Sequence, residues 1–97
     1  KAGPGFVLAV LDIDDFKRIN DAHGHAVGDD VLRYVAKCLM QSFRSDDLVA
    51  RVGGDEFAVL AAGLTSRQAE HRLAGVVARI AAGQAALEST DSARKDV

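Results

Sequence analysis

The feature that most constrains the fold is a short polar segment between two apolar runs in the middle of the chain. The segment is Gly-Gly-Asp-Glu at positions 53–56, and the apolar runs cover residues 48–52 and 57–61. The runs favour pleated strands, and paired glycines can supply the positive φ angles that tight hairpin turns use. The pattern therefore predicts a β-hairpin with two adjacent carboxylates at its tip.

Two interpretations of this tip are open at this point. A solvated turn accepts acidic side chains without any further function. Alternatively, Gly53 and Gly54 let a ligand approach the backbone closely, while Asp55 and Glu56 supply the oxygen atoms that hard divalent cations prefer. The second interpretation describes a site for a metal ion and a polyphosphate.

Composition limits what the rest of the chain can be. The chain has 97 residues, 48% of them hydrophobic and 27% charged, which suffices for one small domain with one core. The net charge of −2 gives no reason to expect a nucleic-acid polymer or an anionic membrane as partner, whereas a small phosphorylated ligand needs only local positive charge. The single cysteine, Cys38, excludes an internal disulfide framework and fits a reducing compartment.

Strand and helix patterns alternate in the first part of the chain. Residues 1–5 predict a loop, and residues 6–11 are six consecutive apolar residues, which predict a central strand buried on both faces. Residues 16–22 predict a short helix, and residues 24–28 predict another loop.

Two longer helices are predicted by apolar residues at helical spacing. The first begins at a cap formed by Asp29 or Asp30 and runs to about Phe43. The second follows the hairpin and begins at a cap formed by Thr65 or Ser66. After Gly83 the periodicity is lost, so the end of the chain is predicted to be a loop or a frayed tail.

Acidic residues also follow the first predicted strand, in the sequence Asp12-Ile13-Asp14-Asp15. Acids at the point where a strand leaves a sheet lie where open α/β folds usually hold ligands; the alternative is that Asp14 or Asp15 caps the next helix. If the first strand pairs beside the hairpin, Asp12 and Asp55 meet at one edge, where two carboxylates repel each other unless a cation lies between them. Mg²⁺ suits such a site because it keeps waters and shares substrate phosphates.

Three separated blocks together resemble the GGDEF family of diguanylate cyclases. The blocks are residues 12–21, then Gly24-His25 with Gly28-Asp29, then residues 53–57. They stand in the family's order and at its spacing, within about residues 6–80. The resemblance implies an α+β fold like the polymerase palm and the class III nucleotide cyclases, with an antiparallel-containing sheet flanked by helices. It also implies that two GTP molecules are joined into cyclic di-GMP, with release of pyrophosphate, at the interface of a homodimer.

The resemblance implies a metal and a catalytic role for four positions. The side chains of Asp12 and Asp55 and the carbonyl of Ile13 would bind Mg²⁺, with Mn²⁺ as an alternative ion. Asp55 is also the family's candidate for taking the proton from the attacking 3′-hydroxyl, and Glu56 would support the metal and the nucleophile.

The resemblance implies a substrate-binding role for a second set of positions. These positions are Asp15, Phe16, Lys17, Asn20, Asp29, Gly53 and Gly54. Amides that open a helix can cradle phosphate, and Lys17 adds positive charge. Asn20 and Asp29 would hold the guanine, because a carboxylate can accept from both N1–H and N2–H₂, which adenine cannot offer. The two glycines would leave room for the nucleotide.

Arg44 and Asp47 match the family's Arg-x-x-Asp site for inhibitory product binding, at the right offset from Gly53. Arginine can pair bidentately with phosphate or a guanine edge, and Asp47 can orient it; the alternative is an ordinary surface ion pair. Because the pair precedes the hairpin and the acids lie at its tip, we expect Arg44 to face away from the metals. Either Arg72 or Arg79 would be a second arginine of that site.

The chain also departs from the family pattern. It lacks an upstream helix with an Asp-x-Leu-Thr-Gly-Leu-x-Asn-Arg stretch, and it lacks a final Ser-Ile-Gly strand followed by a helix carrying a lysine and an arginine. We therefore expect a partial domain, truncated at both ends, and the alternative function is a non-catalytic module that binds GTP or cyclic di-GMP. The expected location is the cytoplasm, either alone or as the cytoplasmic portion of a membrane-tethered sensor, without direct membrane contact by this segment.

Overall fold

Three strands and three helices make up residues 5–95, the part of the chain that the computed structural model describes. In order they are β1 (Phe6–Asp12), α1 (Phe16–His23), α2 (His25–Ser42), β2 (Leu48–Arg51), β3 (Glu56–Ala62) and α3 (Ser66–Lys95). This is the predicted order of elements. Residues 1–4 of the predicted first loop, and the last two residues of the predicted tail, lie outside the described part.

The sheet has β3 at its centre, in the order β1-β3-β2, and both pairings are antiparallel. The prediction of a central first strand buried on both faces is therefore wrong, since β1 is an edge strand. Its residues alternate in exposure, with Phe6, Leu8 and Val10 exposed by 76%, 67% and 61%. A continuous apolar run cannot by itself distinguish a strand covered on both faces from one covered on a single face.

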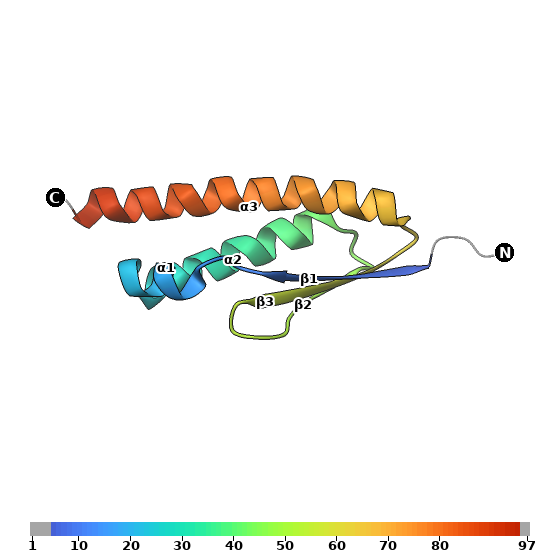
Figure 1. Cartoon of the computed structure of the whole chain (residues 1–97), viewed down its shortest axis with the longest axis horizontal. Helices are drawn as coiled ribbons and strands as arrows, with labels where there is room; N and C mark the ends of the chain where they lie inside the picture. The colour runs from blue at the N-terminus through green and yellow to red at the C-terminus, as the bar shows by residue number, and fades with distance from the viewer. Residues whose placement is uncertain (1–4, 96–97) are drawn as a thin grey trace.

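All three helices lie on one side of the sheet or at its end, as Figure 1 shows. The core lies between this face and the helices α2 and α3. Ile19, Leu39, Val59 and Val76, from α1, α2, β3 and α3, are almost completely buried. Burial of side chains from all three helices and the central strand ties the layers together, because each such side chain contributes roughly 1.5–3 kcal/mol when removed from water.

The junction between α1 and α2 is a single residue and not the predicted loop over residues 24–28. Gly24 adopts a positive φ of 88°, and its N–H donates to the Asn20 carbonyl at 2.8 Å. The Gly28 N–H then donates to the Gly24 carbonyl at 3.1 Å, so helical hydrogen bonding resumes at once. Asp29 and Asp30, predicted as caps, consequently lie inside α2.

The hairpin loop does not need the backbone conformation predicted for its glycines. Within residues 5–95 the only glycines with positive φ are Gly24 and Gly63, so Gly53 and Gly54 are not among them. The strands are joined by four residues, and the N–H groups of Val52 and Gly53 both donate to the Glu56 carbonyl, at 2.9 and 3.4 Å. Longer hairpin loops of this kind do not require the two positive φ angles of a two-residue turn.

The start of α3 is as predicted. The Thr65 hydroxyl accepts from the Gln68 N–H at 3.1 Å, and the Gln68 side chain accepts from the Thr65 N–H at 2.9 Å. This reciprocal capping box satisfies two N–H groups that the first turn leaves free. Gly63, with φ of 79°, directly follows the end of β3.

The end of α3 differs from the prediction, because the helix continues without interruption to Lys95 where a loop or frayed tail was expected from Gly83. The end of α3 is held by side-chain contacts with a residue that is distant in sequence. His23 at the end of α1 pairs with Asp91 at 2.7 Å and with Glu88 at 3.3 Å. Of the helices described within residues 5–95, none has both the length and the apolar character needed to cross a membrane.

Candidate functional site

The end of β1 and the hairpin tip meet at one edge of the sheet. The Ile13 N–H donates to the Asp55 carbonyl at 3.0 Å, and Asp12 is the register partner of Glu56. The Ile13 side chain is buried, with 6% of its surface exposed, so the segment after β1 is anchored in the core. The predicted meeting of the two acidic segments is confirmed at the level of the backbone.

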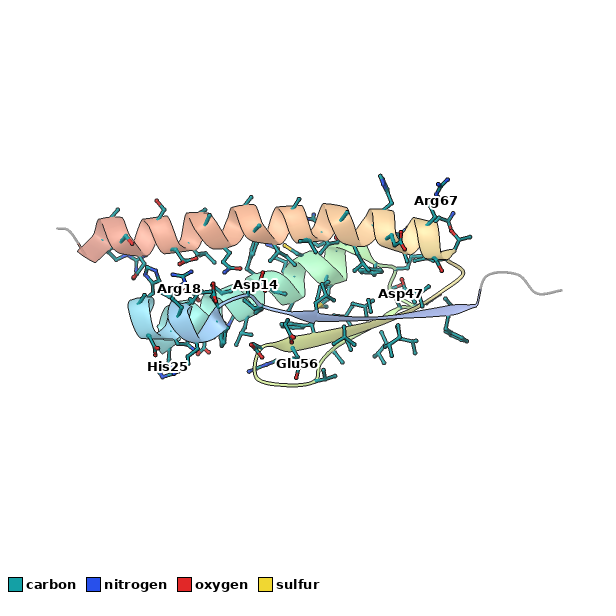
Figure 2. All side chains as sticks on the ribbon, in the orientation of Figure 1. Asp14, Arg18, His25, Asp47, Glu56 and Arg67 are labelled. Atoms are coloured by element: carbon teal, nitrogen blue, oxygen red, sulfur yellow. The ribbon has the colours of Figure 1, made fainter. Side chains whose placement is uncertain are left out.

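Antiparallel register assigns the side chains of this edge to faces of the sheet. Directly opposite residues point to the same face, and successive residues alternate. Asp12 and Glu56 therefore share the face of Leu8 and Leu60, which no helix covers, while Phe57 is buried toward the helices. Figure 2 shows Glu56 on the side of the sheet away from α3.

The two tip glycines have different steric surroundings. A Cβ placed on Gly53 would lie 2.5 Å from the Glu56 Oε1 atom, so this glycine allows the Glu56 carboxylate to fold over the loop. A Cβ on Gly54 would meet nothing within 4 Å. Gly53 is therefore explained by packing inside the tip, whereas the open space beside Gly54 is available to a ligand.

The donor set at this edge consists of oxygen atoms. The predicted metal ligands are the carboxylates of Asp12 and Asp55 and the carbonyl of Ile13, all of which suit a hard cation. Within residues 5–95 no three side chains of histidine, cysteine, aspartate or glutamate form a group that could hold a metal. These oxygen donors suit a hard divalent cation, and one that keeps part of its shell as water and phosphate oxygens needs few protein ligands.

The start of α1 is free of side-chain capping. Asp15 occupies the N-cap position with φ 55° and ψ 33°, a left-handed conformation that costs an ordinary residue of order 1–3 kcal/mol. Its side chain makes no capping hydrogen bond, so the predicted capping role is wrong for this residue. The adjacent amides of Phe16 and Lys17 thus have no side-chain cap, and the Lys17 side chain is exposed beside them.

Asn20 of α1 packs against α2 at Gly28, the residue before Asp29. A Cβ on Gly28 would lie only 1.9 Å from the Asn20 Oδ1 atom, so the Asn20 amide rests directly on the backbone of α2. Asp29 is the next residue and is exposed. The sequence carries no signal for this steric role of Gly28, although the family resemblance predicts that Asn20 and Asp29 bind the base.

Arg44 and Asp47 lie toward the other end of the sheet, as Figure 2 shows for Asp47 relative to Glu56. Asp47 accepts a hydrogen bond from the backbone N–H of Arg44 at 2.8 Å, while the Arg44 Nη2 group donates to the Ala62 carbonyl at 3.2 Å. In the described part of the chain these two side chains form no ion pair, so the interpretation of an ordinary surface ion pair is wrong. A hollow of about 210 Å³ adjoins both residues.

The two candidates for a second arginine have different surroundings. Arg79 donates to the Cys38 carbonyl at 3.5 Å and to the Ser42 hydroxyl, which ties α3 to α2. Arg72 instead lies over the ring of Phe43, with 5.7 Å between its guanidinium carbon and the ring centroid. Both arginines thus contact residues just before Arg44 in the chain, and Arg72 is the one whose guanidinium makes no hydrogen bond within residues 5–95.

Arg51 was not among the predicted site residues. Its Nε atom donates to the carbonyls of Gly53 and Gly54 at 3.1 and 3.2 Å, and its Nη2 atom donates to the Gly54 carbonyl at 2.7 Å. The available signal was its position at the end of β2, directly before the tip. The sequence alone gives no indication that the side chain turns back onto the loop.

The space behind the edge is too small to enclose a nucleotide. A cavity of about 120 Å³ lies between Asp12, Ile13 and the middle of α3. Enclosed sites for drug-sized ligands usually measure roughly 300–1,000 Å³. A nucleotide at this edge would therefore lie over the surface formed by the tip and α1 and would not be enclosed by the described residues.

Comparison with known proteins gives a consistent result over nearly the whole chain. The family profile described as "Diguanylate cyclase, GGDEF domain" matches residues 2–95. Diguanylate cyclase TpbB of Pseudomonas aeruginosa is 50% identical over 86 residues, which is 87% of this chain and 19% of that protein. The cyclic di-GMP phosphodiesterase PdeR of Escherichia coli is 40% identical over 73 residues, 75% of this chain and 11% of that protein.

A solved structure extends the comparison to the fold. The GGDEF domain of DgcB from Caulobacter crescentus, in complex with c-di-GMP, superposes with a TM-score of 0.72 at 38% identity. The match covers 75% of this chain and 43% of that chain. This chain therefore spans less than half of the solved domain and a smaller share of both full-length relatives.

Proposed function

The chain belongs to the GGDEF family of diguanylate cyclases, and on that basis we propose that it condenses two GTP molecules into cyclic di-GMP. One observation carries the proposal above all others. The hydrogen bond from Ile13 to Asp55 joins the acidic end of β1 to the hairpin tip. This contact brings the candidate metal ligands and the candidate catalytic carboxylates to one edge, beside the uncapped start of α1.

Substrate binding is assigned to the two ends of α1. The free amides of Asp15, Phe16 and Lys17 would accept the phosphates, since the first turn of a helix presents unsatisfied N–H groups and positive charge. At the other end, Asn20 and Asp29 would bind the guanine edge. A helix of eight residues is about 12 Å long, which suits a ligand with phosphates at one end and a base at the other.

The reaction itself is a phosphoryl transfer. The 3′-oxygen of one GTP forms a bond to the α-phosphorus of the other, and the bond from that phosphorus to the pyrophosphate oxygen breaks. Asp55 would accept the proton released from the 3′-hydroxyl, and Glu56 would orient the nucleophile. In the second step the 3′-oxygen of the other GTP forms a bond to the α-phosphorus of the first, which closes the ring and releases the second pyrophosphate.

The family uses a divalent metal, and we propose Mg²⁺, with Mn²⁺ as a substitute, held by Asp12, Asp55 and the Ile13 carbonyl. When bound, the cation supplies positive charge that offsets the charge of the phosphates. Burial of the Ile13 side chain and its N–H bond to Asp55 would hold the carbonyl of this residue at the edge.

Catalysis in this scheme needs two chains. Each chain would present one GTP along one copy of α1, and each ring-closing attack crosses from one GTP to the other. A two-fold symmetric homodimer meets this requirement, because it presents the same site twice in opposite directions. The exposed position of the edge, without a covering element among residues 5–95, is compatible with such an encounter.

Product inhibition is proposed for Arg44 and Asp47. The Arg44 guanidinium is anchored through Nη2 on Ala62, and its further donors can serve a phosphate or a guanine edge. Asp47 would accept from a guanine edge. Product bound here would keep two domains apart without competing for the GTP site.

A non-catalytic binding module is the second candidate function. A relative named as a cyclic di-GMP phosphodiesterase carries a matching segment. The presence of Asp12, Asp55 and Glu56 favours the cyclase, because a receptor does not require them. We propose a cytoplasmic location for either function, which the buried free thiol of Cys38 supports.

Incubation of the purified protein with GTP and Mg²⁺, followed by chromatography of the products, tests the proposal. The expected products are cyclic di-GMP and pyrophosphate. Binding of cyclic di-GMP without any product formation would contradict the cyclase function and favour the binding module. Calorimetry with cyclic di-GMP on the same sample distinguishes the two outcomes.

A further inference from the structure

We propose that Arg51 is a positioning residue, which fixes the orientation of two peptide groups at the hairpin tip through hydrogen bonds to their carbonyls. The inference concerns loop geometry first, and its consequence for turnover rests on the proposed cyclase function. It assigns no contact between Arg51 and the reacting atoms.

The contacts of Arg51 are directed at the backbone of its own loop. Nε donates to the carbonyls of Gly53 and Gly54, and Nη2 donates to the Gly54 carbonyl again, at the short distance of 2.7 Å. Within residues 5–95, Arg51 forms no ion pair with a carboxylate. An exposed arginine that directs three contacts to two adjacent carbonyls acts as a clamp on the loop and not as a partner for Asp55 or Glu56.

The orientation of the neighbouring amides follows from the planarity of the peptide group. In a trans peptide the N–H points away from the carbonyl of the same unit. With the carbonyls of Gly53 and Gly54 turned toward Arg51, the N–H groups of Gly54 and Asp55 point to the opposite side. In the described part of the chain these two N–H groups donate to no other group, and the space beside Gly54 is open.

The clamp also acts on the acidic edge. The residue after Gly54 is Asp55, whose carbonyl accepts from Ile13 at 3.0 Å. The peptide units at the tip are therefore fixed on one side by Arg51 and on the other by the segment after β1. Removing Arg51 leaves the bond from Ile13 and the bonds of Val52 and Gly53 to the Glu56 carbonyl, but it frees the carbonyls of Gly53 and Gly54. The peptide unit before Asp55 could then rotate, so the Asp55 side chain would no longer have one fixed position relative to Asp12.

Arginine suits this role better than lysine does. The planar guanidinium presents several donors in a fixed fork and can contact two carbonyls at once, whereas an ammonium group is a compact charge on a flexible stem. Arg51→Met removes all donors while keeping an apolar stem, and Arg51→Lys keeps the charge without the fork. Arg67→Met, at an exposed arginine of α3 that is labelled in Figure 2, is the matched control.

Backbone ¹⁵N relaxation of the ligand-free protein tests the geometry. For Gly54 and Asp55 we expect order parameters of about 0.85 in the wild type and below about 0.6 in Arg51→Met, with Arg51→Lys between them. Arg67→Met should match the wild type. If both Arg51 variants keep wild-type order at these two amides, the inference is overturned, whether or not the protein converts GTP. Should Arg51→Met not fold, the Arg51→Lys spectrum decides alone: unchanged order at both amides overturns the inference.

Steady-state kinetics, measured under conditions in which the wild type converts GTP, test the consequence for turnover. Misplacement of a catalytic carboxylate by about 1 Å can lower the rate roughly 100-fold, so Arg51→Met should lower kcat by about 10- to 100-fold with little change in KM. Unchanged kcat with disordered amides would overturn the role in turnover. If the wild type makes no cyclic di-GMP, the proposed function fails, while loss of amide order in Arg51→Met still supports the clamp.

Discussion

The two ends of the sheet each carry an arginine and an aspartate, but the two arginines are used differently. At the tip, Arg51 donates through Nε and Nη2 to two carbonyls of its own loop. At the other end, Arg44 makes one side-chain hydrogen bond within residues 5–95, to the Ala62 carbonyl. An arginine whose guanidinium donates several hydrogen bonds to the backbone fixes the conformation of a loop. An arginine held by one hydrogen bond still has donors for a ligand. Contacts, and not residue type, therefore separate a positioning arginine from a candidate binding one.

The aspartates differ in the same way. Asp47 is engaged locally, accepting from the backbone N–H of Arg44. Asp55 is held by its main chain, through the bond from Ile13, and its side chain belongs to the acidic edge. The tip thus fixes the main chain of the proposed catalytic residue, and the other end is a turn beside a hollow. Changes at one end should leave the function of the other intact.

The largest expected effect is that of Asp55→Ala. Loss of a general base that also binds metal should lower the rate of cyclic di-GMP formation by about 10²- to 10⁴-fold without loss of the fold. Product chromatography measures the rate, and circular dichroism checks the helices. Asp46→Ala, at an exposed aspartate near the other end, should keep wild-type activity. Normal production by Asp55→Ala would show that the acidic edge is not the catalytic site.

The next effect concerns base recognition by Asp29. In Asp29→Ala a charge-assisted pair of hydrogen bonds to guanine is lost, at a cost of roughly 2–4 kcal/mol, which corresponds to a tens- to hundreds-fold weaker affinity for GTP. Affinity for ATP should change much less, as measured by calorimetry with both nucleotides. Asp30→Ala is the matched control, because Asp30 is exposed and pairs with Arg33 on the surface at 3.1 Å. Equal small losses for GTP and ATP would indicate a structural role for Asp29.

A smaller effect is expected at the other end of the sheet. Arg44→Ala should weaken cyclic di-GMP binding about tenfold, or roughly 1.4 kcal/mol, and relieve product inhibition that is non-competitive with GTP. The initial rate should stay near that of the wild type, because the change leaves the hairpin tip at the opposite end of the sheet intact. Titration of cyclic di-GMP into wild type, Arg44→Ala and Arg67→Ala provides the measurement. Identical affinities in all three proteins would show that Arg44 and Asp47 form a structural turn only.

The smallest effect concerns stability alone. Asp91→Ala removes the nearer of the two acidic partners of the largely buried His23 side chain and should lower the free energy of unfolding by about 1–2 kcal/mol. Urea unfolding followed by circular dichroism measures the change, and Ser89→Ala, at an exposed position in the same part of α3, is the control. Cyclic di-GMP affinity should not change, since α3 meets α1 far along the helix from Arg44. An unchanged midpoint would mean that the long α3 does not depend on this contact.

Much of the fold could be predicted because its signals are local. The capping box of Thr65 and Gln68 lies within one turn, and the apolar spacing of α2 is visible in a window of a few turns. Predictions that required a distant partner were less successful. The end of α3 was expected to be a loop because it has no amphipathic pattern of its own, yet His23 and Arg18 of α1 hold it through Asp91 and Glu88.

The same difference between local signals and distant contacts applies to the candidate site. The sequence alone determined which residue types surround the tip, namely Asp12, Asp55 and Glu56 with two glycines, because the chemistry of oxygen ligands depends on residue identity. It did not determine what lies against Gly53, which is the Glu56 carboxylate, at a position without a positive φ.

Only the tertiary structure decided which surfaces are covered and which contacts the polar side chains make. The apolar run of β1 has the same sequence whether one face or two are buried, and its place at the sheet edge leaves Phe6, Leu8 and Val10 exposed. Arg51 likewise contacts carbonyls that only the folded loop presents. Periodicity and residue type encode what a segment can bury or bind, whereas burial and hydrogen bonding depend on neighbours that the whole chain brings into place.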